Sequence, residues 1–176
     1  MKFLSDFRLL LVGLWLGAAC FFSFAVAPSA FAVLESREMA GSVVNRTLAI
    51  VNYSGLIIGI ILLASSFIAK ETTNRIWLWT ERFLLLILTA ACAVGQFVIA
   101  LWLSMLRGQI GRPVEDVALD DPLRVSFNTW HQYSIWVLVG AMIAALLVFF
   151  IISRKSFTNP KEKVSKDFDF QNEFKI

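Results

Sequence analysis

The sequence is poor in the residues that build catalytic and metal sites. It contains one histidine and two cysteines in 176 residues, and no glycine-rich phosphate loop. One histidine cannot supply a pair of haem ligands, and Cys20 and Cys92 have no ligand partner at helical spacing. Asp and Glu are absent from the four long apolar runs, so no acidic path for protons or ions crosses them. We therefore expect no metal, no cofactor and no enzymatic activity.

Charge is also scarce, at 16% of residues, whereas hydrophobic residues make up 58%. This balance excludes a soluble domain. The apolar runs cover about residues 9–34, 43–69, 83–106 and 127–153, and the fourth helix is predicted to begin before its run and to cover 122–153. Each exceeds the roughly 20 residues that cross a bilayer as a helix. The sequence predicts an all-α fold: one antiparallel bundle of four transmembrane helices over residues 1–153, and a polar, disordered cytoplasmic tail over residues 154–176.

The distribution of Lys and Arg predicts the orientation. With both termini in the cytoplasm, the inner side carries 11 of these residues and the outer side five. This asymmetry satisfies the positive-inside rule. We expect a multi-pass protein of the cell inner (plasma) membrane, with the lipid bilayer as its partner, a possible homo-oligomer and no contact with nucleic acid.

Two prolines mark points along the helices. Pro28 removes a backbone hydrogen bond from the first helix and predicts a kink near its outer end, with helix continuing beyond it. Asp121 followed by Pro122 predicts an N-cap and a helix start. An alternative for the first run is a signal peptide cleaved after Ala32, but the run is longer than the 7–15 residues of a usual signal core.

Small residues four apart predict close helix packing, because apolar helices in lipid associate where backbones can approach. The pairs are Gly13 with Gly17, Gly55 with Gly59, Ala91 with Gly95, and Gly140 with Ala144. They favour a compact bundle, although the same pairs could serve a homodimer.

A few polar residues lie within the apolar runs, all in the outer half of the predicted bundle. They are Ser23, Asn45, Asn52, Gln96, His131 and Ser134. One interpretation is interhelical hydrogen bonding, worth about 0.6 kcal/mol for each bond, with His131 at the headgroups. The other is a small outward-facing site in which His131, with an ordinary pKa of about 6.5, binds a ligand or relays a proton.

Two elements resemble a known family. Trp15-x-Gly17, Phe21-Phe22-x-Phe24 and Ala27-Pro28-x-x-Phe31, followed by Ala40-Gly41, look like the start of domain of unknown function 4149. Phe127-x-x-Trp130-His131-x-x-Ser134 is similar to a later element of that family, with Trp130 in place of the usual Leu. The resemblance implies a four-helix bacterial membrane protein related to a eukaryotic transmembrane protein associated with cisplatin resistance. It implies no established activity.

Two functions remain open from the sequence. The first is a non-enzymatic bundle with a structural or envelope role, or with a small outward-facing ligand site. The second is a small transporter or efflux component for metals or drugs. Its pore would require an oligomer, because four helices with so few polar residues leave little room for one.

Overall fold

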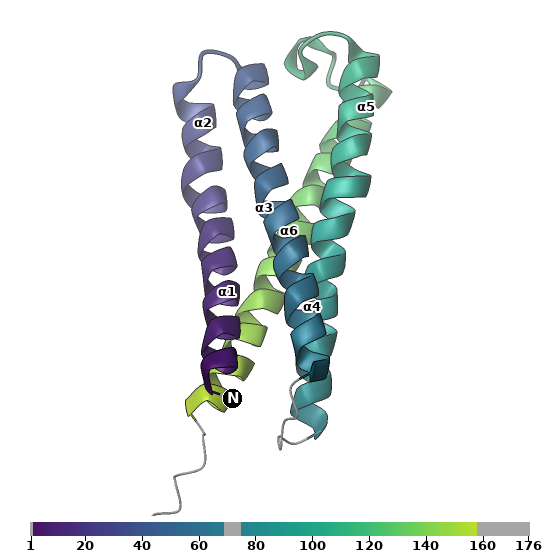
Figure 1. Ribbon diagram of the computed structural model, residues 1–176. Coiled ribbons are helices and arrows are strands. Elements are labelled where there is room, and N and C mark those ends of the chain that lie inside the picture. The colour runs from purple at the N-terminus through teal and green to yellow at the C-terminus, as the bar shows by residue number, and fades with distance from the viewer. Residues whose placement is uncertain (1, 69–74, 158–176) are drawn as a thin grey trace, which may run out of the picture.

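The computed structural model describes residues 2–68 and 75–157, and this part is helical with short links (Figure 1). The first rod comprises α1 (Lys2–Phe21), the π-helical segment η1 (Phe22–Val26) and α2 (Ala27–Val33); the second is α3 (Arg37–Ile68). The third comprises α4 (Arg75–Val94), the π-helical segment η2 (Gly95–Ile99) and α5 (Ala100–Ile110); the fourth is α6 (Pro122–Phe157). All four rods are long and apolar enough to cross a membrane. The predicted all-α bundle of four such helices is confirmed.

The helices extend beyond the apolar runs into residues that the sequence assigned to links. Residues 37–42, 75–82 and 107–110 are helical. A helix satisfies its own backbone hydrogen bonds in lipid and at the headgroups alike, whereas hydropathy marks only the part in hydrocarbon. At the other end of the chain, α6 includes residues 154–157 of the predicted tail. Residues 158–176 lie outside the described residues.

The first rod passes through Pro28 without ending. Pro28 occupies the first turn of α2, and the wider π turn of η1 immediately precedes it. A π turn shifts the backbone bonding pattern, which accommodates a residue that has no N–H. Helix continues beyond Pro28 to Val33, as the sequence predicted, and it ends one residue before the predicted end because Leu34 is extended. The size of a kink at Pro28 stays a prediction.

The start of α6 is capped as predicted. The backbone N–H of Leu123 donates to Oδ1 of Asp121 at 2.8 Å, and Pro122 opens the helix. This cap fixes where the fourth rod leaves the link from α5. That link begins at Gly111, whose φ of 65° ends α5 in the left-handed conformation. It contains the short 3-10 turn η3 (Val114–Asp116).

The core lies where α6 crosses the other rods. In Figure 1, α6 passes behind α3, from beside α5 at one end to beside α1 at the other, and it packs against α1, α4 and α5. Trp15 is 2% exposed, and its Nε1 donates to the carbonyl of Val51 on α3 at 2.9 Å. Trp15 therefore links the first and second rods by both packing and a hydrogen bond.

The predicted small-residue contacts form in only part of the bundle. A Cβ at Gly55 or Gly59 would collide with Trp15 or Thr89, and one at Gly95 would lie 3.2 Å from Asn52. Ala144 is buried, Ala91 packs against the core, and a Cβ at Gly13 would lie 3.4 Å from Phe149. At Gly17 and Gly140, however, the space beside the backbone is open. The prediction of packing at these two positions is wrong for the single chain. The spacing of small residues shows that they share one face of a helix, but it does not show whether another helix packs against that face.

This difference in packing predicts different effects on stability for two glycine substitutions. Gly55→Ala places a methyl group 2.5 Å from Trp15 Nε1 and 2.6 Å from Cys92 Sγ. Such overpacking should lower the free energy of unfolding by about 1–3 kcal/mol. Gly17→Ala should leave it unchanged or raise it by up to about 1 kcal/mol, since alanine favours helix. Reversible unfolding in mixed dodecyl maltoside and SDS micelles measures both, and equal losses would contradict the described packing.

Candidate functional site

A cavity lined by polar and apolar side chains lies at the end of the bundle that holds the links of residues 34–36 and 111–121. We call this end the outer end, after the orientation that the Lys and Arg distribution predicts. The cavity has a volume of about 610 Å³ and is bounded by α3, α5, α6 and the link containing η3. This volume falls within the range of roughly 300–1,000 Å³ that is typical of small-molecule sites.

Three of the predicted polar residues line this outer cavity: Asn45 on α3, and His131 and Ser134 on α6. The hydroxyl of Ser134 donates to the carbonyl of His131 at 2.8 Å. The imidazole of His131 lies parallel to the ring of Phe127, one helical turn earlier, with centroids 6.3 Å apart. The structure therefore brings together residues that are more than 80 positions apart in the sequence.

Arginines also line the outer cavity, and sequence reasoning missed them because it treated them only as orientation signals. Arg37, Arg107, Arg112 and Arg124 outnumber two glutamates, Glu38 and Glu115. The charged link after Arg107 could have pointed to these arginines. The sequence alone, however, does not show that this link folds back over α3 and α6. The outer cavity has an excess of positive charge.

Two of these arginines hold the link in place. Arg124 donates from Nη1 to the carbonyl of Glu115 at 3.2 Å and to that of Val117. Arg37 Nε lies 3.5 Å from Oε2 of Glu115, an ion pair between α3 and the link. Both contacts connect different elements around the rim of the outer cavity.

Arg107 is placed differently. Its side chain is half-buried, and its guanidinium carbon lies 5.3 Å from the ring centroid of Phe127. Within residues 2–68 and 75–157, no ion pair or hydrogen bond of its side chain is found. Stacking uses the face of the guanidinium and leaves its N–H edge available. Arg107 is thus an arginine in the outer cavity whose donors can serve a ligand.

A second, much smaller cavity lies directly below the first. It has a volume of about 10 Å³ and is lined by Asn52, Cys92 and Gly95, among others. Leu48 and Ser134 line both cavities. A space of roughly 10–15 Å³ holds one water molecule. Asn52, which is 6% exposed, therefore belongs to this inner space and not to the outer cavity.

The two remaining candidates lie elsewhere. Ser23 donates to the carbonyl of Ala19 on its own helix at 2.8 Å, and its Oγ is 3.9 Å from Sδ of Met142. Gln96 belongs to η2, and its Oε1 is buried without a hydrogen-bond partner in the described part of the chain. The six predicted residues therefore do not form one site.

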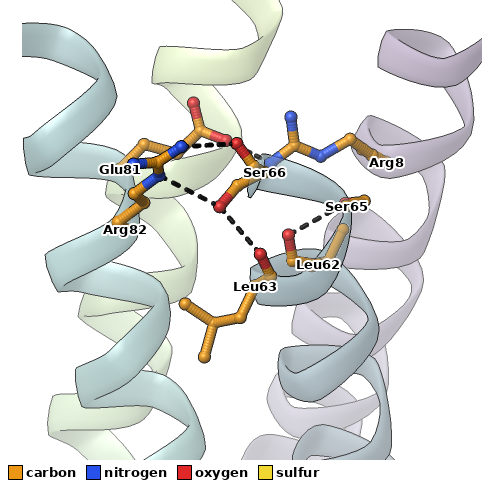
Figure 2. Close-up of polar contacts among 7 residues, drawn as sticks. All are labelled: Arg8, Leu62, Leu63, Ser65, Ser66, Glu81 and Arg82. Atoms are coloured by element: carbon orange, nitrogen blue, oxygen red, sulfur yellow. Dashed lines mark hydrogen bonds and ion pairs between the residues drawn. The ribbon is translucent and has the colours of Figure 1, made fainter. Parts of the chain in front are cut away.

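A buried polar cluster occupies the opposite, inner end (Figure 2). Arg8 of α1 forms an ion pair with Glu81 of α4, and the side chains are 4% and 0% exposed. The next residue of α4, Arg82, donates to the carbonyl of Ser66 on α3 at 2.7 Å and to its hydroxyl at 3.3 Å. The cluster joins the first three rods at one level.

The apolar runs predict that Glu81 lies in the link before the third helix, outside the bundle, and this prediction is wrong. Because α4 already begins at Arg75, Glu81 lies six residues inside the helix and faces the core. Arg8 and Glu81 each lie six residues from the start of their helix, which is about 9 Å at 1.5 Å per residue. The sequence did not predict this shared depth, because the apolar run of the third helix begins only at about residue 83.

Metal ligands are not grouped in the described part of the chain. No three His, Cys, Asp or Glu side chains come together there, and both cysteines are free.

Four membrane-spanning rods and polar cavities between them define a multi-pass helical membrane protein. A family model described as a domain of unknown function (DUF4149) matches residues 10–112. The chain belongs to this family, as the motifs from Trp15 to Gly41 predicted. The match ends before Phe127–Ser134, so the resemblance of that element stays a prediction. Comparison with curated proteins and with solved structures gave no significant match.

Proposed function

We infer that this protein is a non-enzymatic membrane protein that binds a small ligand in the outer cavity. The observation that carries the proposal is the cavity of about 610 Å³, into which Asn45, His131 and Arg107 converge from three helices. Ligand sites are typically concave and largely apolar, with a few polar groups that fix the orientation of the ligand. Phe31, Leu48 and Leu103 supply the apolar part of this lining.

The proposed orientation places both termini in the cytoplasm and the outer cavity on the far side of the plasma membrane. The positive-inside asymmetry supports this orientation. The outer cavity is lined at its rim by exposed charged residues such as Arg37, Arg112 and Glu115. A ligand would therefore reach it from the outer surface or from the outer leaflet.

The alternative of a transporter receives less support. The space that adjoins the floor of the outer cavity is only about 10 Å³, and the groove of about 750 Å³ between α1 and Phe149 shares no lining residue with the outer cavity. Residues such as Trp15, Leu85 and Leu88 fill the core between the helices. Passage of a metal or drug through this protein would thus require an oligomeric pore, whereas binding requires only the cavity within one chain.

Filling the outer cavity tests the proposal. A gene-deletion strain is first screened for growth with metals, cationic drugs and envelope stress, and the defect is then complemented with variants. Asn45→Trp places a large side chain in the outer cavity and should complement no better than the empty vector. Val43→Trp is the matched control, because Val43 lies on the same helix, is 45% exposed and does not line the cavity. Full complementation by Asn45→Trp, at an equal protein level, would contradict ligand binding there.

A further inference from the structure

The chemistry of the outer cavity changes with depth. Charged residues lie near the helix ends: Arg37 opens α3, and Arg112 follows α5. Leu48 lies 11 residues into α3 and Leu103 seven residues before the end of α5, which places them about 17 Å and 11 Å from those ends at 1.5 Å per residue. The outer cavity therefore combines a positively charged mouth with an apolar floor.

Arg107 lies between these two layers. Its guanidinium stacks on Phe127 of α6, and a Cβ at Gly41 of α3 would lie 3.5 Å from its Nη2. The side chain of Arg107 thus reaches across the outer cavity from α5 towards α3. Glu38, which acts on it electrostatically, is exposed at the rim. Arg37 and Arg124 are occupied with the link, so Arg107 and Arg112 are the arginines available to a ligand.

We propose that the ligand of the outer cavity is an anionic amphiphile: a phosphate or carboxylate head group on an apolar chain. This inference rests on the function proposed above. The N–H edge of Arg107 pairs with two oxygens of the head group, as guanidinium does with planar or tetrahedral oxyanions. Arg112 adds positive charge at the mouth, and the chain lies against Leu48, Leu103 and Phe127. A membrane lipid and a free amphiphilic acid share this chemistry.

Native mass spectrometry of the full chain in dodecyl maltoside tests the proposal with defined probes. The protein is exposed to equimolar phosphatidylglycerol and phosphatidylcholine, and separately to dodecyl phosphate or inorganic phosphate. Both lipids offer a phosphate to Arg107, but the choline cation of phosphatidylcholine cancels its net charge and is repelled by the arginines. We therefore expect a preference of about tenfold for phosphatidylglycerol, which corresponds to about 1.4 kcal/mol. Binding of dodecyl phosphate, but not of phosphatidylglycerol, would identify a free amphiphile as the source.

Variants locate the binding. Arg107→Gln should remove the preference, Arg112→Gln should reduce it a few fold, and Asn45→Trp should abolish binding at the outer cavity. Arg46→Gln is the control, because Arg46 is an exposed arginine of α3 that does not line the outer cavity. Arg112 is exposed, so its substitution keeps the test valid even if Arg107→Gln unfolds the protein.

Three results would overturn the inference. Equal binding of both lipids, lost in Asn45→Trp, would leave the proposed ligand site intact but remove its preference for anions. Competition by inorganic phosphate as strong as that by dodecyl phosphate would remove the apolar chain from the assignment. An unchanged lipid preference in both Arg107→Gln and Arg112→Gln would place the bound anion elsewhere on the protein.

Discussion

Replacing Glu81 by alanine should lower the free energy of unfolding by about 3–5 kcal/mol, because it leaves the buried charge of Arg8 without its carboxylate. The two side chains are 4% and 0% exposed and come from α1 and α4, so water cannot replace the lost partner. Arg8→Ala should have a similar effect for the converse reason. Reversible unfolding in mixed dodecyl maltoside and SDS micelles measures both losses.

The double variant Arg8→Leu with Glu81→Leu separates charge pairing from packing. Apolar residues of similar size in place of a buried ion pair are often neutral or stabilising, so the double variant should be much closer to the wild type than either single change. Arg75→Gln, at an exposed position on the same helix as Glu81, should change stability by no more than about 0.5 kcal/mol. Additive losses in the double variant would show that the pair is not coupled.

Trp15→Ala is the second substitution with a large expected effect. It should lower the free energy of unfolding by about 3–5 kcal/mol, because it leaves a cavity between α1, α3 and α4 that the helices cannot fully close. Trp15 is 2% exposed, its indole lies against Gly55, and it belongs to the same core cluster as Cys92. The measurement is the same unfolding equilibrium, read by circular dichroism so that loss of a tryptophan does not affect the signal.

Two further variants divide this loss into its parts. Trp15→Phe keeps most of the ring volume but removes the donor to Val51, which should cost about 1 kcal/mol. Trp136→Ala removes a tryptophan that is 64% exposed on α6 and should cost no more than about 0.5 kcal/mol. Similar losses for Trp15→Ala and Trp136→Ala would show that Trp15 does not occupy the core as described.

The structure brings only part of the predicted set of polar residues together in the outer cavity. The sequence correctly identified Asn45, His131 and Ser134 as polar residues near the outer end, and these line one cavity. It also grouped Ser23 and Gln96 with them, but depth along a helix does not determine which face a side chain occupies. Ser23 bonds its own helix, and Gln96 lies in a π turn that residue spacing could not predict.

Two charged residues were wrongly left out of the bundle by the sequence prediction. Hydropathy placed Glu81 and Arg107 outside the apolar runs and therefore outside the bundle. Both lie on helices that extend past the apolar runs, where one helical face still packs against neighbouring helices. Glu81 is fully buried, and Arg107 is half-buried beside Phe127.

The sequence by itself determined the four membrane-spanning helices, the cap at Asp121, the passage of helix through Pro28 and the family, since each depends on local composition, spacing or a contiguous motif. Tertiary structure alone decided that Arg8 meets Glu81 and that Trp15 donates to Val51. It also decided that Arg107 faces an outer cavity with His131. The physical reason is that lipid provides no hydrophobic drive for helices to associate, so helix rotation and pairing depend on the fit of individual side chains.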